Sequence, residues 1–292
     1  MRHMFAAVAL GAMLVMAMPV VATAGSGGVS SVRERIESSM VVSGDVTIET
    51  DGSVSALRVE KQDELPPSVV KLVRDAGLKW KFEPVVRNGV AVRALAPMSL
   101  RVIARKLDLG RYEISLRGIN FSRLDGDDPE SIARIEMTPP RYPVQAFRAG
   151  VSGSVYLLLK VGRDGKVEDV FAEQVNLTFL SGESEQRLGR EVLAKSAIAA
   201  ARQWTFRVPT QGAEAGQAFW NVRVPVGFSL GDAAAEGQGP ARWESYVAGP
   251  RERAPWRDDS DPLGFAPDAL VDGSVNLVDN NGPRLLTPLQ GS

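Results

Sequence analysis

The sequence has no cysteine and a single histidine, and these two shortages restrict its chemistry more than any other feature. Without cysteine, the chain has no thiolate nucleophile, no disulfide and no attachment site for a lipoprotein anchor. The histidine, His3, lies in a segment that we expect export to remove. The mature chain therefore excludes Ser-His-Asp and Cys-His catalytic sites as well as ordinary zinc sites.

The sequence also lacks an excess of charge and a glycine-rich phosphate loop. Its 34 Lys and Arg residues nearly balance 35 Asp and Glu residues, for a formal net charge of −1, so nothing indicates nucleic acid as a partner. Acidic clusters at 125–128 and 258–261 stand among Pro and Gly, as in loops or linkers. Calcium at 125–128 and two-carboxylate hydrolysis are less favoured alternatives. We therefore expect no enzyme activity, no catalytic residue, no metal and no small-molecule cofactor.

Residues 1–24 have the pattern of a cleavable signal peptide. Arg2 precedes an apolar run from Met4 to Val21, and the small residues Ala22-Thr-Ala24 suit a cleavage site. The run is also long enough for an uncleaved membrane anchor, which is the alternative. The pattern predicts an exported protein.

The segment 139–230 has the periodicity of a small α+β domain. Alternating apolar residues over 155–161 predict a strand, and Asp164-Gly165 is a strong signal for a tight hairpin. A return strand is expected over 167–175. A helix follows, whose buried stripe ends at Trp204.

The third strand of this segment is expected over 219–228. Alternate residues from Trp220 to Phe228 are apolar and predict a core-facing side, while Asn221 and Arg223 fall on a side expected to face solvent. Pro225 cannot donate a ladder hydrogen bond, which places the strand at a sheet edge or at a bulge. An exposed edge has to be blocked or serves to recruit another strand.

Several short motifs in this segment resemble the C-terminal domain of TonB-type energy transducers, and the resemblance covers about a third of the chain. It implies a periplasmic domain that binds a short N-terminal segment of outer-membrane receptors by adding it to the third strand. The matching residues are Pro140-Arg-Tyr142-Pro143, Ala146, Gly150, Gly153-x-Val155, Asp164-Gly165, Ala200-x-x-x-Trp204-x-Phe206 and Val224-Pro-Val-x-Phe228.

The resemblance implies a set of partner-binding residues along the third strand and just before the first. Tyr142 could instead pack beneath the first strand as part of the structure. The edge could also be capped by its own loop or by a second copy in a homodimer. The candidate binding residues are Tyr142, Pro143, Phe219, Trp220, Asn221, Val222, Arg223, Val224, Pro225, Val226, Gly227 and Phe228.

Residues 29–119 look like a degenerate second copy of the same unit. Asp51-Gly52 repeats the hairpin signal, and Trp80-x-Phe82 repeats Trp204-x-Phe206. Internal duplication explains both copies with one assumption. The predicted fold is therefore α+β, with two tandem units that are each a small three-stranded antiparallel sheet packed by one helix. A linker at 120–138 joins them.

The C-terminal tail, residues 231–292, has no Lys, many Pro, Gly and Asp, and only scattered aromatic residues. This composition predicts a mostly disordered tail. The exception is the short apolar run Ala269–Val278, which contains an Asp-Gly turn and could dock on a free strand edge and mask it.

These observations favour a non-enzymatic periplasmic binding module, linked to TonB-dependent transport, that recruits a strand of an outer-membrane receptor or another envelope protein. The alternative is an energy transducer held in the inner membrane by Met4–Val21. Such a transducer needs a long spacer to cross the periplasm, and only a short stretch precedes the first repeat.

Overall fold

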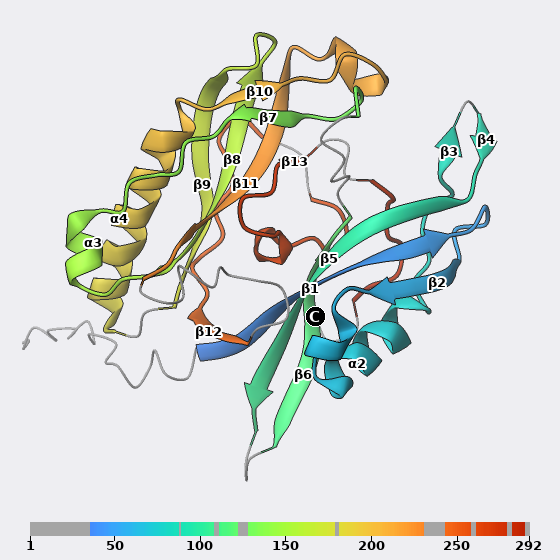
Figure 1. Cartoon of the computed structure of the whole chain (residues 1–292), viewed down its shortest axis with the longest axis horizontal. Coiled ribbons are helices and arrows are strands. Elements are labelled where there is room, and N and C mark those ends of the chain that lie inside the picture. Colours follow the sequence, from blue (N-terminus) through green and yellow to red (C-terminus); the bar gives the residue numbers. More distant parts are fainter. Residues whose placement is uncertain are drawn as a thin grey trace, which may run out of the picture.

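The computed structural model describes residues 36–87, 89–107, 111–121, 128–178, 181–230, 243–257, 261–278 and 282–289. Its main feature is a sheet of nine strands in the order β13-β11-β8-β9-β12-β1-β5-β6, with β2 beside β1 (Figure 1). The strands are β1 (Ile36–Ile48), β2 (Val54–Val59), β5 (Ala94–Lys106), β6 (Tyr112–Asn120), β8 (Gly153–Gly162), β9 (Val167–Leu177), β11 (Phe219–Phe228), β12 (Glu244–Val247) and β13 (Asn276–Leu277).

The C-terminal half confirms the predicted hairpin and helix. Strands β8 and β9 are joined by the turn at Asp164-Gly165, where Gly165 has a φ of +77°. Helix α4 (Glu183–Ala201) follows and packs on β9 and β8. Its residues Leu193 and Ala197 are fully buried in one apolar cluster with the inner face of β8 and β11. A short pair, β7 (Ala133–Glu136) with β10 (Thr205–Arg207), lies outside the main sheet.

The N-terminal half has a similar construction. Helix α2 (Pro67–Gly77) packs on β2 and β6 and carries the buried residues Val69 and Val73 into a second apolar cluster. A small hairpin, β3 (Val86–Arg87) with β4 (Val90–Ala91), precedes β5, and the 3-10 turns are η1 (Gln62–Glu64), η2 (Ala213–Gly216) and η3 (Pro267–Ala269).

The two Asp-Gly turns close against the chain in the same way. The backbone N–H of Phe206 donates to the carbonyl oxygen of Gly165 at 2.8 Å, and that of Phe82 donates to Gly52 at 2.8 Å. Both glycines have a φ near +78°, at +77° and +78°. The two turns therefore share one backbone geometry, and the duplication of the unit stays a prediction.

The prediction of two separate three-stranded sheets needs correction. Strand β12 pairs with β1 on one side and with β9 on the other, so that both halves share one sheet. The joining strand comes from the C-terminal tail, whose pairing partners lie far away in the sequence. The signal peptide expected at 1–24 lies outside the described residues, and no helix among those described is long and apolar enough to cross a membrane.

The prediction of disorder is wrong for the described parts of the tail. Residues 243–257, 261–278 and 282–289 fold back onto the rest of the chain, and Figure 1 shows these orange to red segments beside the strands of both halves. Tyr246 is 3% exposed and Leu270 is 2% exposed. The tail has too few apolar residues for a core of its own, but several of them, such as Leu277 and Leu285, pack into the two cores of the preceding chain.

The Asp-Gly turn requires a residue without a Cβ atom at position 165. A Cβ atom there would lie 2.1 Å from the carbonyl oxygen of Phe206, and the positive φ strains any L side chain. We expect Gly165→Ala to lower the free energy of unfolding by about 1 to 3 kcal/mol. Gly216→Ala is the matched control, because a Cβ atom at Gly216 has no neighbour within 4 Å. Urea unfolding followed by tryptophan fluorescence measures both, and equal effects would contradict this requirement.

Candidate partner-binding edge

Strand β11 pairs with β8 over its full length, from Phe219 opposite Gly162 to Phe228 opposite Gly153. Its inner face is the predicted apolar one. Val222 and Val224 are fully buried in the cluster beneath α4. The strand therefore rests on a solid core, which fixes the position of its backbone.

Pro225 is tolerated because of the direction in which its backbone points. Its carbonyl oxygen accepts a hydrogen bond from the N–H of Gly273, on the side away from β8. In an antiparallel ladder the N–H and C=O groups of one residue point to the same side. The hydrogen that proline lacks is thus missing from the outer edge, and no bond to β8 is lost.

The outer edge of β11 is occupied by the tail. Strand β13 pairs with it in antiparallel register, with Val222 opposite Leu277 and Arg223 opposite Asn276. The N–H of Val278 donates to the carbonyl oxygen of Asn221 at 2.9 Å. The docking expected for the run Ala269–Val278 is therefore found, and the edge position that Pro225 predicted for β11 is capped by the chain itself.

The second face of β11 does not meet solvent, which corrects the prediction for Asn221 and Arg223. These side chains are 8% and 2% exposed. Trp256 of the tail donates from Nε1 to Asn221 Oδ1 at 3.1 Å. On the same face Leu158 is fully buried in a small cluster with Ala254 and Val278. The tail forms the cover that the strand pattern alone could not indicate.

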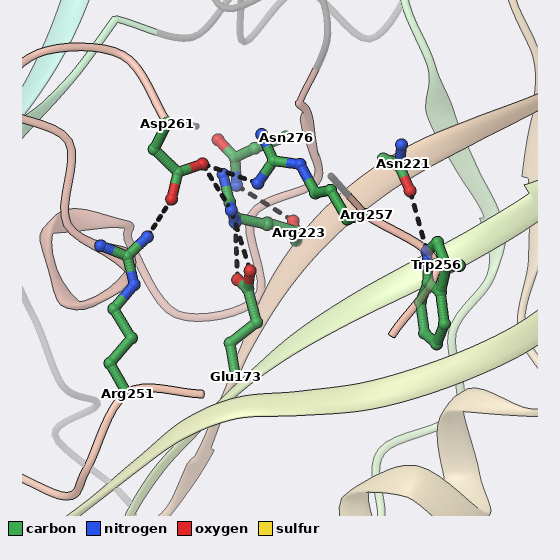
Figure 2. A network of polar contacts seen from close by, with 8 residues as sticks. All are labelled: Glu173, Asn221, Arg223, Arg251, Trp256, Arg257, Asp261 and Asn276. Carbon is green, nitrogen blue, oxygen red and sulfur yellow. Dashed lines mark hydrogen bonds and ion pairs between the residues drawn. The ribbon is translucent and has the colours of Figure 1, made fainter. Parts of the chain in front are cut away.

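Arg223 is the centre of the polar contacts under this cover (Figure 2). Its guanidinium donates twice to Glu173 of β9, from Nε to Oε2 at 2.6 Å and from Nη2 to Oε1 at 2.9 Å. Nη2 also donates to Asp261 Oδ1 of the tail at 2.7 Å. Arg257 and Arg251 hold the same Asp261 carboxylate. One buried cation is thus neutralised from a strand and from the tail at once.

The charges in this cluster reinforce one another. Burial opposes the charged form of Arg223, but its hydrogen bonds and attraction to Glu173 and Asp261 outweigh burial and raise the pKa of the guanidinium. Burial likewise opposes the ionised form of Asp261, yet Arg223 and Arg257 bring the pKa of the carboxyl below its ordinary value. The ring of Phe265 lies 4.4 Å from the Arg223 guanidinium and covers it further.

A second group of polar contacts, around Arg101, holds the tail at Asp268. Arg101 of β5 donates from Nε to the Asp268 carbonyl oxygen at 2.5 Å and from Nη2 to the Tyr156 hydroxyl at 3.2 Å. Asp272 lines the same cavity of about 50 Å³. Burial raises the pKa of Asp272 to about 6, against the attraction of Arg101. Its Oδ2 has no hydrogen-bond partner among the described residues.

Tyr142 and Pro143 lie directly before helix α3 (Val144–Arg148). The Tyr142 hydroxyl donates to the Val151 carbonyl oxygen at 2.6 Å, and its ring packs edge-on against Phe228 with centroids 5.5 Å apart. Burial raises the pKa of Tyr142 to about 12. Pro143 is the N-terminal cap of α3. These contacts favour a packing role for Tyr142 over contact with a partner strand.

The strand pattern identified β11 but missed the carboxylates that meet it. The candidate residues did not include Glu173 and Asp261, which pair with Arg223 across long stretches of sequence, or Asp272, which lines the cavity beside Arg101. The available signals were an arginine between apolar neighbours and the Asp-Gly turn at 272–273. Among the described residues, no group of three or more His, Asp or Glu side chains could hold a metal ion.

The buried ion cluster predicts a large effect of removing its cation. We expect Arg223→Leu to lower the free energy of unfolding by about 3 to 5 kcal/mol, because the Glu173 carboxylate is left buried without a partner. Arg58→Leu, which removes an exposed ion pair with Asp45, should cost at most about 1 kcal/mol. The double variant Arg223→Leu with Glu173→Leu should recover much of the loss. Urea unfolding measures all three, and a double variant no better than Arg223→Leu would contradict the assignment.

The raised pKa of Asp272 predicts a pH dependence of stability. Its pKa is about 6 in the folded chain and 3.8 ordinarily, so the folded state holds the proton more tightly. The stabilisation is complete below about pH 4 and is lost as pH rises through 6, by about 3 kcal/mol. Asp272→Asn does not titrate and should lack this loss. Parallel unfolding curves of the two proteins between pH 4 and 7.5 would contradict the prediction.

Comparison with known proteins gives two curated relatives. The chain is 38% identical over 99 residues to "Protein TonB" from each of two strains of Xanthomonas campestris pv. campestris. The match covers 34% of this chain and 38% of each relative, so the chain spans well under half the length of those proteins. No protein-family model matches the chain. No solved structure matches it either. About a third of the chain is thus a TonB-like domain.

Proposed function

We propose that the chain is a non-enzymatic periplasmic binding module that takes up a strand of a protein partner along the outer edge of β11. The similarity to proteins named TonB supports a place in the cell envelope and a role related to TonB-dependent transport. The proposed partner is an outer-membrane receptor segment or another envelope protein. A second copy pairing through the same edge is the homodimeric variant of this proposal.

The observation that carries the proposal is the pairing of β13 with β11. Carbonyl oxygens of Asn221 and Pro225 accept backbone hydrogen bonds from Val278 and Gly273, so the outer edge takes an extended segment in suitable geometry. Backbone pairing gives affinity and alternating side chains set the register. Phe219–Phe228 has ten residues, enough for a partner to add several further bonds.

The proposal predicts that an outward N–H group of β11 contributes to binding. The backbone groups of Asn221, four residues before Pro225, point to the same outer edge. Asn221→Pro should weaken binding of a labelled synthetic peptide, copying the N-terminal segment of a TonB-dependent outer-membrane receptor, by about tenfold. Fluorescence anisotropy with peptide up to millimolar concentration measures it.

Asn221→Ala is the matched control, because it loses the side-chain bond to Trp256 and keeps the backbone N–H. It should bind within about twofold of the unaltered chain. Equal weakening in both variants would assign the effect to the side chain and argue against strand addition. No binding to any form would remove the receptor segment as partner.

A further inference from the structure

The segment Val271–Val278 occupies the part of β11 where a partner strand would add. It begins with a tight turn, in which Gly273 has a φ of +73° and the Ser274 N–H donates to the Val271 carbonyl oxygen at 3.0 Å. The Gly273 N–H then donates to the carbonyl oxygen of Pro225 at 2.9 Å. Further along, Asn276 Nδ2 donates to the carbonyl oxygen of Arg223 at 3.3 Å. The segment thus satisfies three successive outward carbonyl groups of one strand.

We infer that Val271–Val278 is a built-in substitute for the partner strand, which keeps the β11 edge closed until a partner displaces it. This inference rests on the proposed function. It adds that the site is occupied by the chain itself at rest, and that the occupant indicates what kind of segment the site accepts.

The pairing is short enough for exchange. In the part of the chain that the structure describes, β13 has two residues, whereas β11 has ten. A partner that pairs along more of β11 would form more backbone hydrogen bonds than the segment it replaces. Each such bond contributes about 0.5 to 1.5 kcal/mol, so a few additional ones are sufficient to favour the partner.

The occupant also defines the chemistry of the site. Leu277 is 9% exposed and joins the core cluster opposite Val222, while Val278 is 3% exposed and packs by Leu158. Asn276, opposite Arg223, is an uncharged amide. Since Glu173 and Asp261 already neutralise Arg223, this position has no need of an acidic partner residue. The site fits an extended segment with an amide or small polar residue followed by aliphatic residues.

The tail remains attached when the segment leaves. Two anchors precede the segment: Asp261 is held by Arg223 and Arg257, and the Asp268 carbonyl group is held by Arg101. A segment tethered so closely returns as soon as the edge is free, because its effective concentration at the edge is high. Binding of a partner is therefore a competition with a nearby competitor and requires no unfolding of the tail.

Two substitutions at Gly273 test the inference: one should open the β11 edge, and the other should leave it closed. Gly273→Pro removes the N–H that donates to Pro225 and cannot adopt the φ of +73°. Gly273→Asn keeps the N–H and tolerates the left-handed conformation. With a labelled synthetic peptide copying Leu270–Val278 as probe, Gly273→Pro should bind about tenfold more tightly than the unaltered chain. Gly273→Asn should stay within about twofold.

A disulfide tests the same point without opening the fold. The chain has no native cysteine, and Val222 and Leu277 lie directly opposite in a pair whose backbone groups point away from each other. The double variant Val222→Cys with Leu277→Cys should bind the same peptide about tenfold more weakly when oxidised than when reduced.

Equal peptide affinity in the oxidised and reduced forms, or no gain in Gly273→Pro, would overturn the inference. A receptor peptide separates it from the proposed function. If Gly273→Pro binds the Leu270–Val278 peptide and not the receptor peptide, the built-in substitute stands and the receptor partner falls. If the receptor peptide binds the oxidised double-cysteine variant as tightly as the reduced one, the inference of a built-in substitute is wrong and the proposed binding function is retained.

Discussion

The structure depends on the burial of one charge, the guanidinium of Arg223. It lies in the middle of the outermost long strand and is 2% exposed. A buried cation without partners is strongly destabilising, so the fold must bring carboxylates to it. Glu173 comes from β9, two strands away in the sheet, but Asp261 comes from the tail, and the tail therefore has to lie across this face. The contact that neutralises Arg223 therefore also fixes the position of the tail.

The tail in this position joins the two halves and covers one face of the sheet. Its first strand, β12, fills the gap between β9 and β1 and turns two small sheets into one. Its middle part covers the face that holds Leu158 and Tyr156, and Arg101 ties β1, β5 and β8 to Asp268. An antiparallel sheet with one solvated face is common. In the C-terminal half both faces are covered, one by α4 and the other by a tail rich in Pro, Gly and Asp.

The sequence allowed prediction of features that depend on near neighbours. Alternation located β8 and β11, the Asp-Gly pairs located the turns, and helical spacing placed Trp204 in the core, where it is 3% exposed. It did not allow prediction of contacts between distant segments, such as Arg223 with Asp261, which are 38 positions apart. A strand pattern cannot distinguish a polar side that meets water from one that meets a polar cover. Tyr156 and Leu158, apolar residues on that same side, were one local sign of a cover, because both are buried.

Protecting an edge and using it for binding place opposite demands on the same backbone groups. An unpaired edge invites uncontrolled association, so it has to be closed. A closure that pairs along the whole of β11 would prevent any partner from binding. The two-residue pairing of β13 meets both demands, because it satisfies the carbonyl groups nearest Arg223 and leaves most of the strand's binding potential to a longer competitor. In the proposed exchange, the stability of the closed state resides in the contacts of Asp261 and Asp268, which both precede the paired residues, so that the edge exchanges strands while the tail stays in place.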